Sequence, residues 1–280
     1  MLEVCNLKKS FNNKKVLEDV NFKLKPGEIV CLLGKNGSGK TTIINCILKM
    51  LKQDSGHIFL DGLNIDEYDS KRYFSNISSL LESSINVYNY LTAMENIEYF
   101  SGLLDINIDY DYINFLLDIF SLSECKDKNV GTFSLGMRQK LAIIISLLSE
   151  PKVLLLDEPT LGLDIESKIS IIKILKNLAI NKNISILITT HQIDVVEKIK
   201  GRVILLKSGK IENFSLNKFK SKFLLKYKYN SEIITREVDS DLIDILTNIK
   251  LENLIEISKL DVNLEDIVME KLNEFNKSWI

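Results

Sequence analysis

The stretch GKNGSGKTT at residues 34–42 constrains the fold of this chain more than any other feature of its sequence. It matches the pattern G-x-x-x-x-G-K-[ST], follows the apolar run EIVCLL and precedes the apolar-rich segment TTIINCILKML. In such a loop the glycines let backbone N–H groups close around phosphates, the lysine reaches the β- and γ-oxygens, and the threonine hydroxyl can ligate Mg²⁺. The sequence therefore predicts a phosphate-binding loop between a buried strand and a helix. Its candidate binding residues are Gly34, Lys35, Asn36, Gly37, Ser38, Gly39, Lys40, Thr41 and Thr42.

Strand and helix patterns alternate over most of the chain. Apolar runs at 153–156, 184–190 and 202–209 read as strands, with helical segments at 135–149 and about 165–181 between them. Strands that alternate with helices indicate a mostly parallel sheet wrapped by helices. The predicted fold class is α/β, preceded by short N-terminal strands.

Two regions depart from this alternation. From about 83 to 149 the pattern is helical, and Thr92 and Glu95 stand at the spacing of a capping box. After Gly209 the pattern changes, and we interpret residues 214–280 as a small α+β appendage. In the appendage we expect strands at 223–229, 232–238 and 254–260 and helices at 241–251 and 263–275.

Composition excludes several classes of protein. The formal net charge is −2, whereas general nucleic-acid binders usually show a clear basic excess, so no nucleic-acid partner is expected. The four cysteines lie far apart without a CxxC spacing, which argues against a cysteine metal or redox motif and fits a reducing cytoplasm. A bilayer span needs roughly 20 apolar residues, and the apolar runs here are shorter, so the chain is not expected to cross a membrane by itself.

Two further motifs carry chemistry. The stretch VLLLDE places Asp157 and Glu158 at the tip of a buried strand, where the aspartate could hold Mg²⁺ and the glutamate could deprotonate an attacking water. A solvated strand end is the plain alternative. The stretch FSLGMRQKLAII places Ser134 and Gly136 at the start of an apolar helix, which is a second anion site; there the alternative is a serine that only caps a core helix.

The motifs GKNGSGKT, FSLGMRQK, VLLLDEPT, LGLD and TTH occur in that order, and residues 1 to about 212 resemble the nucleotide-binding subunit of ATP-binding cassette (ABC) transporters. The resemblance implies a P-loop ATPase domain at 1–213 with antiparallel N-terminal strands and a helical subdomain at about 83–149. It also implies ATP and Mg²⁺ as cofactors, and a head-to-tail homodimer, or heterodimer with a second ABC subunit. In that pair the signature helix of one copy grips the γ-phosphate bound by the other.

The resemblance assigns further residues. His191 matches the switch histidine that supports Glu158, Asp164 matches the D-loop carboxylate at the dimer interface, and Phe11 stands where the family stacks an aromatic ring on adenine, although a core phenylalanine fits there nearly as well. The other histidine, His57, is assigned to structure. Glu82 stands where the family usually has a glutamine that touches Mg²⁺ and the permease, and a solvated loop glutamate is the alternative.

The signature form SLGMRQ and the ending NLEDIVMEKL are similar to exporters of drugs, lantibiotics and peptides with ABC-2-type permeases. We therefore expect an ATP hydrolase at the inner face of the cell membrane that powers a separate permease. Two alternatives stay open: an ABC-type ATPase acting on nucleic acid or the ribosome, and an assembly factor for iron–sulfur clusters.

Overall fold

The computed structural model describes residues 1–12, 14–81, 87–214, 222–229, 232–238 and 254–260. The chain divides into two compact units, Met1–Phe214 and Ser215–Ile280.

The first unit contains a ten-stranded mixed sheet in the order β5-β4-β1-β2-β10-β9-β3-β8-β7-β6. The strands are β1 (Leu2–Phe11), β2 (Lys14–Leu24), β3 (Ile29–Leu33), β4 (Ser55–Leu60), β5 (Leu63–Asn64), β6 (Ile77–Leu80), β7 (Val153–Asp157), β8 (Ser185–Thr190), β9 (Arg202–Lys207) and β10 (Lys210–Phe214). Strands β9, β3, β8, β7 and β6 pair in parallel, whereas β5, β4, β1 and β2 pair antiparallel. The predicted fold class, including the antiparallel N-terminal strands, is confirmed.

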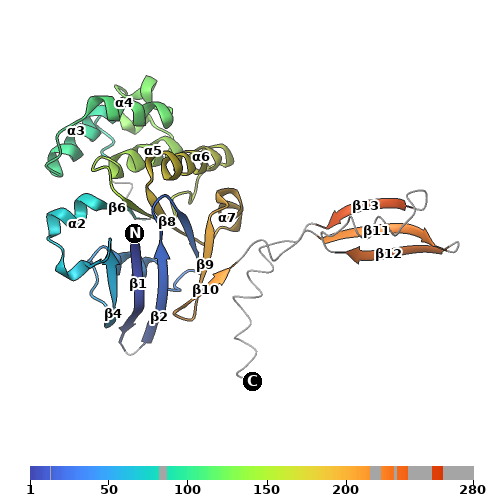
Figure 1. Ribbon diagram of the computed structural model, residues 1–280. Coiled ribbons are helices and arrows are strands. Elements are labelled where there is room, and N and C mark those ends of the chain that lie inside the picture. The colour runs from blue at the N-terminus through green and yellow to red at the C-terminus, as the bar shows by residue number, and fades with distance from the viewer. Residues whose placement is uncertain (13, 82–86, 215–221, 230–231, 239–253, 261–280) are drawn as a thin grey trace. The chain divides into compact units, whose positions relative to one another are not determined.

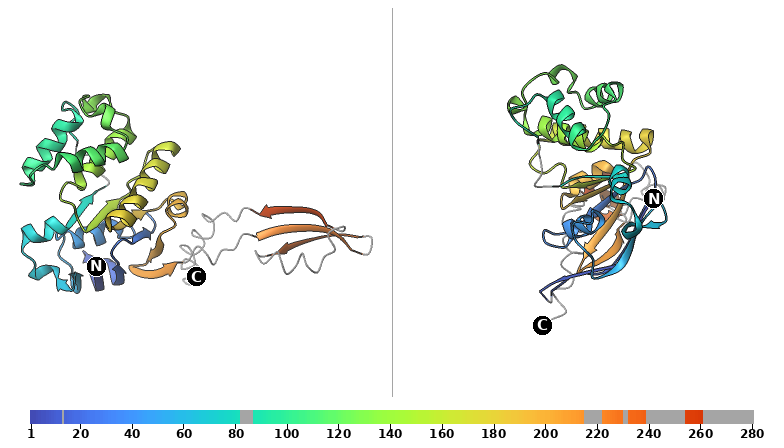
Figure 2. Two further views of the ribbon diagram at one scale, coloured as in Figure 1. Left: turned by 45° about the horizontal axis from the view of Figure 1, so that its top comes forward. Right: turned by 90° about the vertical axis from the view of Figure 1, so that its left-hand side faces the viewer.

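Seven α-helices and three short 3₁₀ helices complete the described part of this unit. They are α1 (Lys40–Ile47), η1 (Ile65–Glu67), α2 (Ser70–Asn76), α3 (Ala93–Leu103), α4 (Tyr110–Ile119), η2 (Ser123–Cys125), η3 (Val130–Thr132), α5 (Leu135–Ser146), α6 (Ile165–Lys182) and α7 (Ile193–Ile199). Helices α3 and α4 group at one end of the unit, next to α5 and away from β1, β2 and β4 (Figure 1). The views in Figure 2 also place this helical group away from the antiparallel N-terminal strands.

The central parallel strands form the core of the first unit. Every residue of β3, β7 and β8 is buried, which agrees with their near-continuous apolar sequences. On one side of the sheet α1 contributes Ile43, Ile44 and Ile47, each fully buried. Burying a side chain of this size stabilises the fold by about 1.5–3 kcal/mol relative to leaving it exposed, so α1 is firmly packed on the sheet.

Helix α3 begins where the sequence signals predict, whereas α2 and β6 were not predicted. The Thr92–Glu95 capping box is confirmed: Glu95 N–H donates to Thr92 Oγ1 and Thr92 N–H donates to the Glu95 carboxylate. Helix α5 ends at Ser146, with Leu147 as its C-cap, rather than at the expected 149. Pro151 restricts only Glu150, whose φ is +47°, so it does not account for the earlier end. Helix α2 and β6 are short and largely polar, so periodicity did not reveal them.

The second unit contains a three-stranded antiparallel sheet in the order β12-β11-β13. These strands, β11 (Lys222–Tyr229), β12 (Glu232–Val238) and β13 (Leu254–Leu260), lie where the sequence predicts strands. The helices expected at 241–251 and 263–275 lie outside the described residues.

Candidate functional site

The phosphate-binding loop, the acidic pair and the switch histidine meet at one edge of the sheet. Because β8 lies between β3 and β7, and all three run in parallel, their carboxyl ends are neighbours. In register, Leu33 pairs with Thr190 and Asp157 pairs with Thr189. The segments that follow these strands therefore converge, as ligand-binding loops do at the carboxyl edge of parallel sheets.

The loop after β3 folds as a phosphate cradle. Gly37 and Gly39 have φ of +75° and +106°, values that residues with a side chain rarely adopt. A Cβ on Gly39 would also lie 2.9 Å from the Leu17 side chain, so only glycine fits there. Lys40 is buried, and its Nζ donates to the Gly34 carbonyl at 2.8 Å.

One buried polar atom of this loop is left unsatisfied. Ser38 Oγ is buried and has no hydrogen-bond partner among the described residues. A buried hydroxyl without a partner costs free energy, and native structures normally satisfy such groups. Ser38 is not among the residues that line the hollow described below, so we assign this hydroxyl no ligand; the glycine turn around Gly37 and Gly39 is the feature that fits phosphate oxygens.

Thr41 and Asp157 fit a magnesium ion. Thr41 Oγ1 donates to Asp157 Oδ2 at 2.8 Å, and Thr189 Oγ1 donates to Asp157 Oδ1. A hydroxyl and a carboxylate are hard oxygen ligands of the kind Mg²⁺ prefers, alongside phosphate oxygens and water. These two residues would hold the ion, with Thr189 fixing the carboxylate from behind.

Glu158 is held tightly at the same edge. Its backbone has φ of +50°, a left-handed conformation that is strained for a non-glycine residue. Successive side chains in a strand point to opposite faces, and this bend after β7 allows both Asp157 and Glu158 to line one hollow. The carboxylate accepts from Thr190 Oγ1 at 3.1 Å, and its Oε1 lies 2.7 Å from His191 Nδ1 and 3.9 Å from Lys40 Nζ.

Gly39, Lys40, Thr41, Asp157 and Glu158 line an open hollow of about 350 Å³, whereas Ser38 and His191 are not among its lining residues. Its wall includes Asn36, Gly37, Thr42 and, at the start of the chain's second strand, Val16. Phe11 also lines it and is 45% exposed, so its ring is a surface feature rather than part of the core. A half-exposed flat ring beside a phosphate cradle has the surface that stacking on a nucleobase requires.

The second predicted anion site lies elsewhere on the chain. Ser134 is the N-cap of α5 and accepts from Met137 N–H at 3.2 Å, while Asp164 caps α6 and accepts from Ser167 N–H at 2.9 Å. In the described structure none of Ser134, Gly136 and Asp164 lines the hollow of the phosphate loop. Glu82 lies outside the described residues.

Sequence reasoning missed the residues that support the site. Thr189 and Thr190 each bond one carboxylate of the acidic pair, and Thr190 Oγ1 also accepts from Gln192 N–H at 3.0 Å. Two hydroxyls ending an apolar strand, in LITTH, were an available signal. His57 lies on β4 with Nδ1 3.4 Å from Asn64 Nδ2, remote from the hollow.

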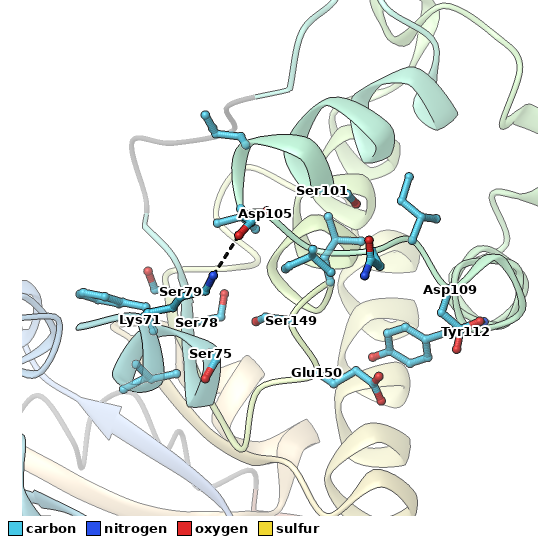
Figure 3. A pocket seen from close by; sticks show the side chains of 18 of the residues that line it. Lys71, Ser75, Ser78, Ser79, Ser101, Asp105, Asp109, Tyr112, Ser149 and Glu150 are labelled. Atoms are coloured by element: carbon cyan, nitrogen blue, oxygen red, sulfur yellow. Dashed lines mark hydrogen bonds and ion pairs between the residues drawn. The ribbon is translucent and has the colours of Figure 1, made fainter. Parts of the chain in front are cut away.

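A larger groove of about 790 Å³ lies between α2 and β6 on one side and the α3–α4 region on the other. Lys71 Nζ and Asp105 Oδ2 form an ion pair at 2.9 Å between its two sides, and Tyr112 and Glu150 lie toward its other end (Figure 3). Four exposed apolar side chains line it: Met50, Phe74, Leu103 and Leu104.

Two features are absent from the described residues. No helix there is both long enough and apolar enough to span a bilayer. No group of three or more histidine, cysteine, aspartate or glutamate residues there is arranged to hold a metal ion.

The fold and the phosphate cradle are those of a P-loop nucleoside triphosphatase. The family model described as "ABC transporter" matches residues 17–161, and a second model, "AAA domain, putative AbiEii toxin, Type IV TA system", matches residues 129–197. The chain is 34% identical over 212 residues to the uncharacterized ABC transporter ATP-binding protein YdbJ of Bacillus subtilis, covering 76% of this chain and 68% of YdbJ.

Two further similarities agree with this match. The chain is 34% identical to the methionine import ATP-binding protein MetN of Legionella pneumophila over 75% of its own length and 63% of MetN. The fold matches the dimeric structure of MJ0796, a bacterial ABC transporter cassette, with a TM-score of 0.65 at 26% identity, covering 76% of this chain and 97% of that one. The chain belongs to the ABC transporter family.

Family membership gives the biochemical activity in general terms. The chain is an ATP-binding subunit that hydrolyses ATP, with ATP and Mg²⁺ as its cofactors. The expectation of this family and fold is confirmed.

Proposed function

We propose that this chain powers a separate membrane permease through ATP-driven closing and opening of a head-to-tail pair of cassettes. The partner cassette is a second copy or a related ABC subunit, and the pair sits at the inner face of the membrane through the permease.

One observation carries the proposal: the two anion sites of the chain are separate. The hollow beside Lys40 holds the cradle and the acidic pair, whereas Ser134 caps a helix outside it. Ser134 is exposed, and because its Oγ accepts from Met137 N–H, its own hydroxyl hydrogen remains able to donate to an anion. A helix start of this kind attracts phosphate, so ATP in one hollow would be completed by the α5 start of the partner.

Within the hollow we assign a role to each side chain. The cradle and Lys40 bind the phosphates, Thr41 and Asp157 hold Mg²⁺, and Phe11 stacks on the base. Bound Mg²⁺ neutralises phosphate charge. Glu158 orients the attacking water and takes its proton, since its carboxylate lies beside Lys40 and His191 at the open end of β7.

The direction of transport is proposed as export of a peptide, lantibiotic or drug-like compound. The support is the signature form FSLGMRQ at residues 133–139. Relatives of this chain include the methionine importer MetN, so the family as a whole does not determine direction.

The groove between α2 and α3 is the surface we assign to the permease. Its exposed Phe74, Leu103 and Leu104 form an apolar lining of the kind that marks protein contacts. We expect Leu103→Asp to reduce recovery of the permease when the chain is purified from membranes in mild detergent. Ile180→Asp is the matched control, since Ile180 on α6 is 77% exposed, compared with 67% for Leu103, and does not line the groove.

The pair itself is tested by dilution. Specific ATPase activity of the purified chain should rise with protein concentration, because two chains are needed for one complete site. Activity per chain that stays constant from dilute to concentrated protein would contradict the proposal. If the same chain co-purifies with ribosomes and no membrane protein, the transport role is excluded.

A further inference from the structure

The first turns of α5 and α6 touch through Gly136 and Ser167. A Cβ built on Gly136 would lie 2.4 Å from Ser167 Oγ and 2.9 Å from Ser167 Cβ, and the next nearest atom is Ser134 Oγ at 3.9 Å. Gly136 is buried, whereas its neighbours Ser134 and Leu135 are exposed. The face of Gly136 that a side chain would occupy is therefore turned toward its own α6.

Ser167 cannot simply move away from this contact. Its Oγ donates to Asp164 Oδ2 at 2.8 Å, and its backbone N–H donates to Asp164 Oδ1 at 2.9 Å. These two bonds hold the pKa of the Asp164 carboxyl below its usual range. Rotating the hydroxyl would break its bond to Asp164 Oδ2, and the Cβ is fixed by the helix backbone.

We infer that Ser167 is a positioning residue, which fixes the start of the signature helix α5 against the capped start of α6, and that residue 136 is glycine to accommodate it. This inference rests on the proposed function, because the α5 start is the group that binds the partner's nucleotide. Ser167 thereby couples the position of the Ser134 anion site to that of the Asp164 cap.

The phosphate contact alone would suggest a different reason for glycine at position 136. A glycine at a phosphate site is usually explained by close approach of the ligand to the backbone. Here the space beside Gly136 is taken by a side chain of the same chain. The two explanations predict different results when Ser167 is made smaller.

The test is a graded rescue in the Glu158→Gln background, where ATP-dependent pairing is measured by size-exclusion chromatography. The variants are Gly136→Ala, Gly136→Ala with Ser167→Ala, and Gly136→Ala with Ser167→Gly. Ser167→Ala removes the atom at 2.4 Å and leaves the one at 2.9 Å, whereas Ser167→Gly removes both. Gly102→Ala is the matched control, since Gly102 is also in a helix and a Cβ there would meet nothing within 4 Å.

We expect Gly136→Ala to raise the ATP concentration for half-maximal pairing about tenfold. Ser167→Gly should largely restore it, Ser167→Ala should restore it in part, and Gly102→Ala should leave it unchanged. Binding of a fluorescent ATP analogue to the dilute single chain should be the same in all variants, because the Lys40 cradle is untouched. That readout separates a positioning role from general damage to the fold.

The opposite results are distinguishable. If Gly136→Ala with Ser167→Gly pairs no better than Gly136→Ala alone, while Glu158→Gln itself pairs with ATP, the inference is wrong and the proposed function stands. If Glu158→Gln does not pair with ATP at any concentration, the proposed function is wrong, and the positioning role is wrong with it.

Discussion

His191 Nδ1 lies 2.7 Å from Glu158 Oε1, although the two residues belong to segments that follow different strands. Thr190 holds the other carboxylate oxygen at 3.1 Å. Both oxygens of Glu158 therefore have a partner before any substrate arrives, and the side chain is oriented rather than free to rotate. Orientation of this kind lowers the entropy cost of placing a catalytic group.

Glu158→Gln should lower ATP turnover about 100-fold or more, because the amide cannot accept a proton from water. The variant should still bind ATP and collect as an ATP-dependent pair. Phosphate release and chromatography with ATP measure these two properties. Glu197→Gln, an exposed change on α7, is the control and should behave as the unaltered chain. Normal turnover in Glu158→Gln would rule out Glu158 as the base.

His191→Ala should lower kcat about tenfold to 100-fold with little change in KM, because the base loses the group that orients it. Steady-state kinetics at saturating Mg²⁺ measure the two constants. His57→Ala removes the other histidine of the chain, which contacts Asn64 and not Glu158, and should leave both constants unchanged. Equal effects of the two substitutions would refute the role of His191.

Thr189→Val should raise the Mg²⁺ concentration for half-maximal activity about tenfold, since the carboxylate of Asp157 loses the hydroxyl behind it. Thr190→Val is the crossed control: it removes the bond to Glu158 and should lower kcat with an unchanged Mg²⁺ requirement. The measurement is ATPase activity of both variants as a function of Mg²⁺ concentration. The same shift in both would mean that the two threonines do not act on separate carboxylates.

Glu28→Gln should lower stability at pH 7 by about 1 kcal/mol, which corresponds to a fall in Tm of about 2–4 °C. Glu28 precedes β3 and bonds Arg202 Nε at 2.7 Å at the start of β9, so the pair joins two core strands. Burial raises the pKa of Glu28, but the bonds from Arg202 and from Lys25 N–H outweigh it and leave the pKa below 4.5.

The sign of the pH dependence follows from that direction. A depressed folded-state pKa contributes stability that is present above the unfolded value and is lost as pH falls through the folded value. The difference in Tm between the unaltered chain and Glu28→Gln should therefore be constant near neutrality and shrink below pH 4.5. A difference that grows with acidification would contradict the assignment. Thermal unfolding followed by circular dichroism over this pH range is the measurement.

Sequence reasoning located the parts of the site that depend on local chemistry. The cradle at 34–42, the Thr92 capping box and the buried strand before Asp157 follow from residue spacing over one loop or one turn. It did not predict elements whose hydrophobic periodicity is weak. Helix α2 is seven residues long and mostly polar, and β10 is a short exposed strand, so neither has a clear period.

The sequence by itself determined which residues are candidates for the site, because loops, caps and strand ends are formed by contiguous residues. The tertiary structure alone decided which of them meet: Thr41 bonds Asp157 across 116 positions, and Ser167 fills the space beside Gly136. It also produced the apolar groove between α2 and α3. Such contacts arise from parallel strand order and close packing, which join segments far apart along the chain and leave no local pattern in it.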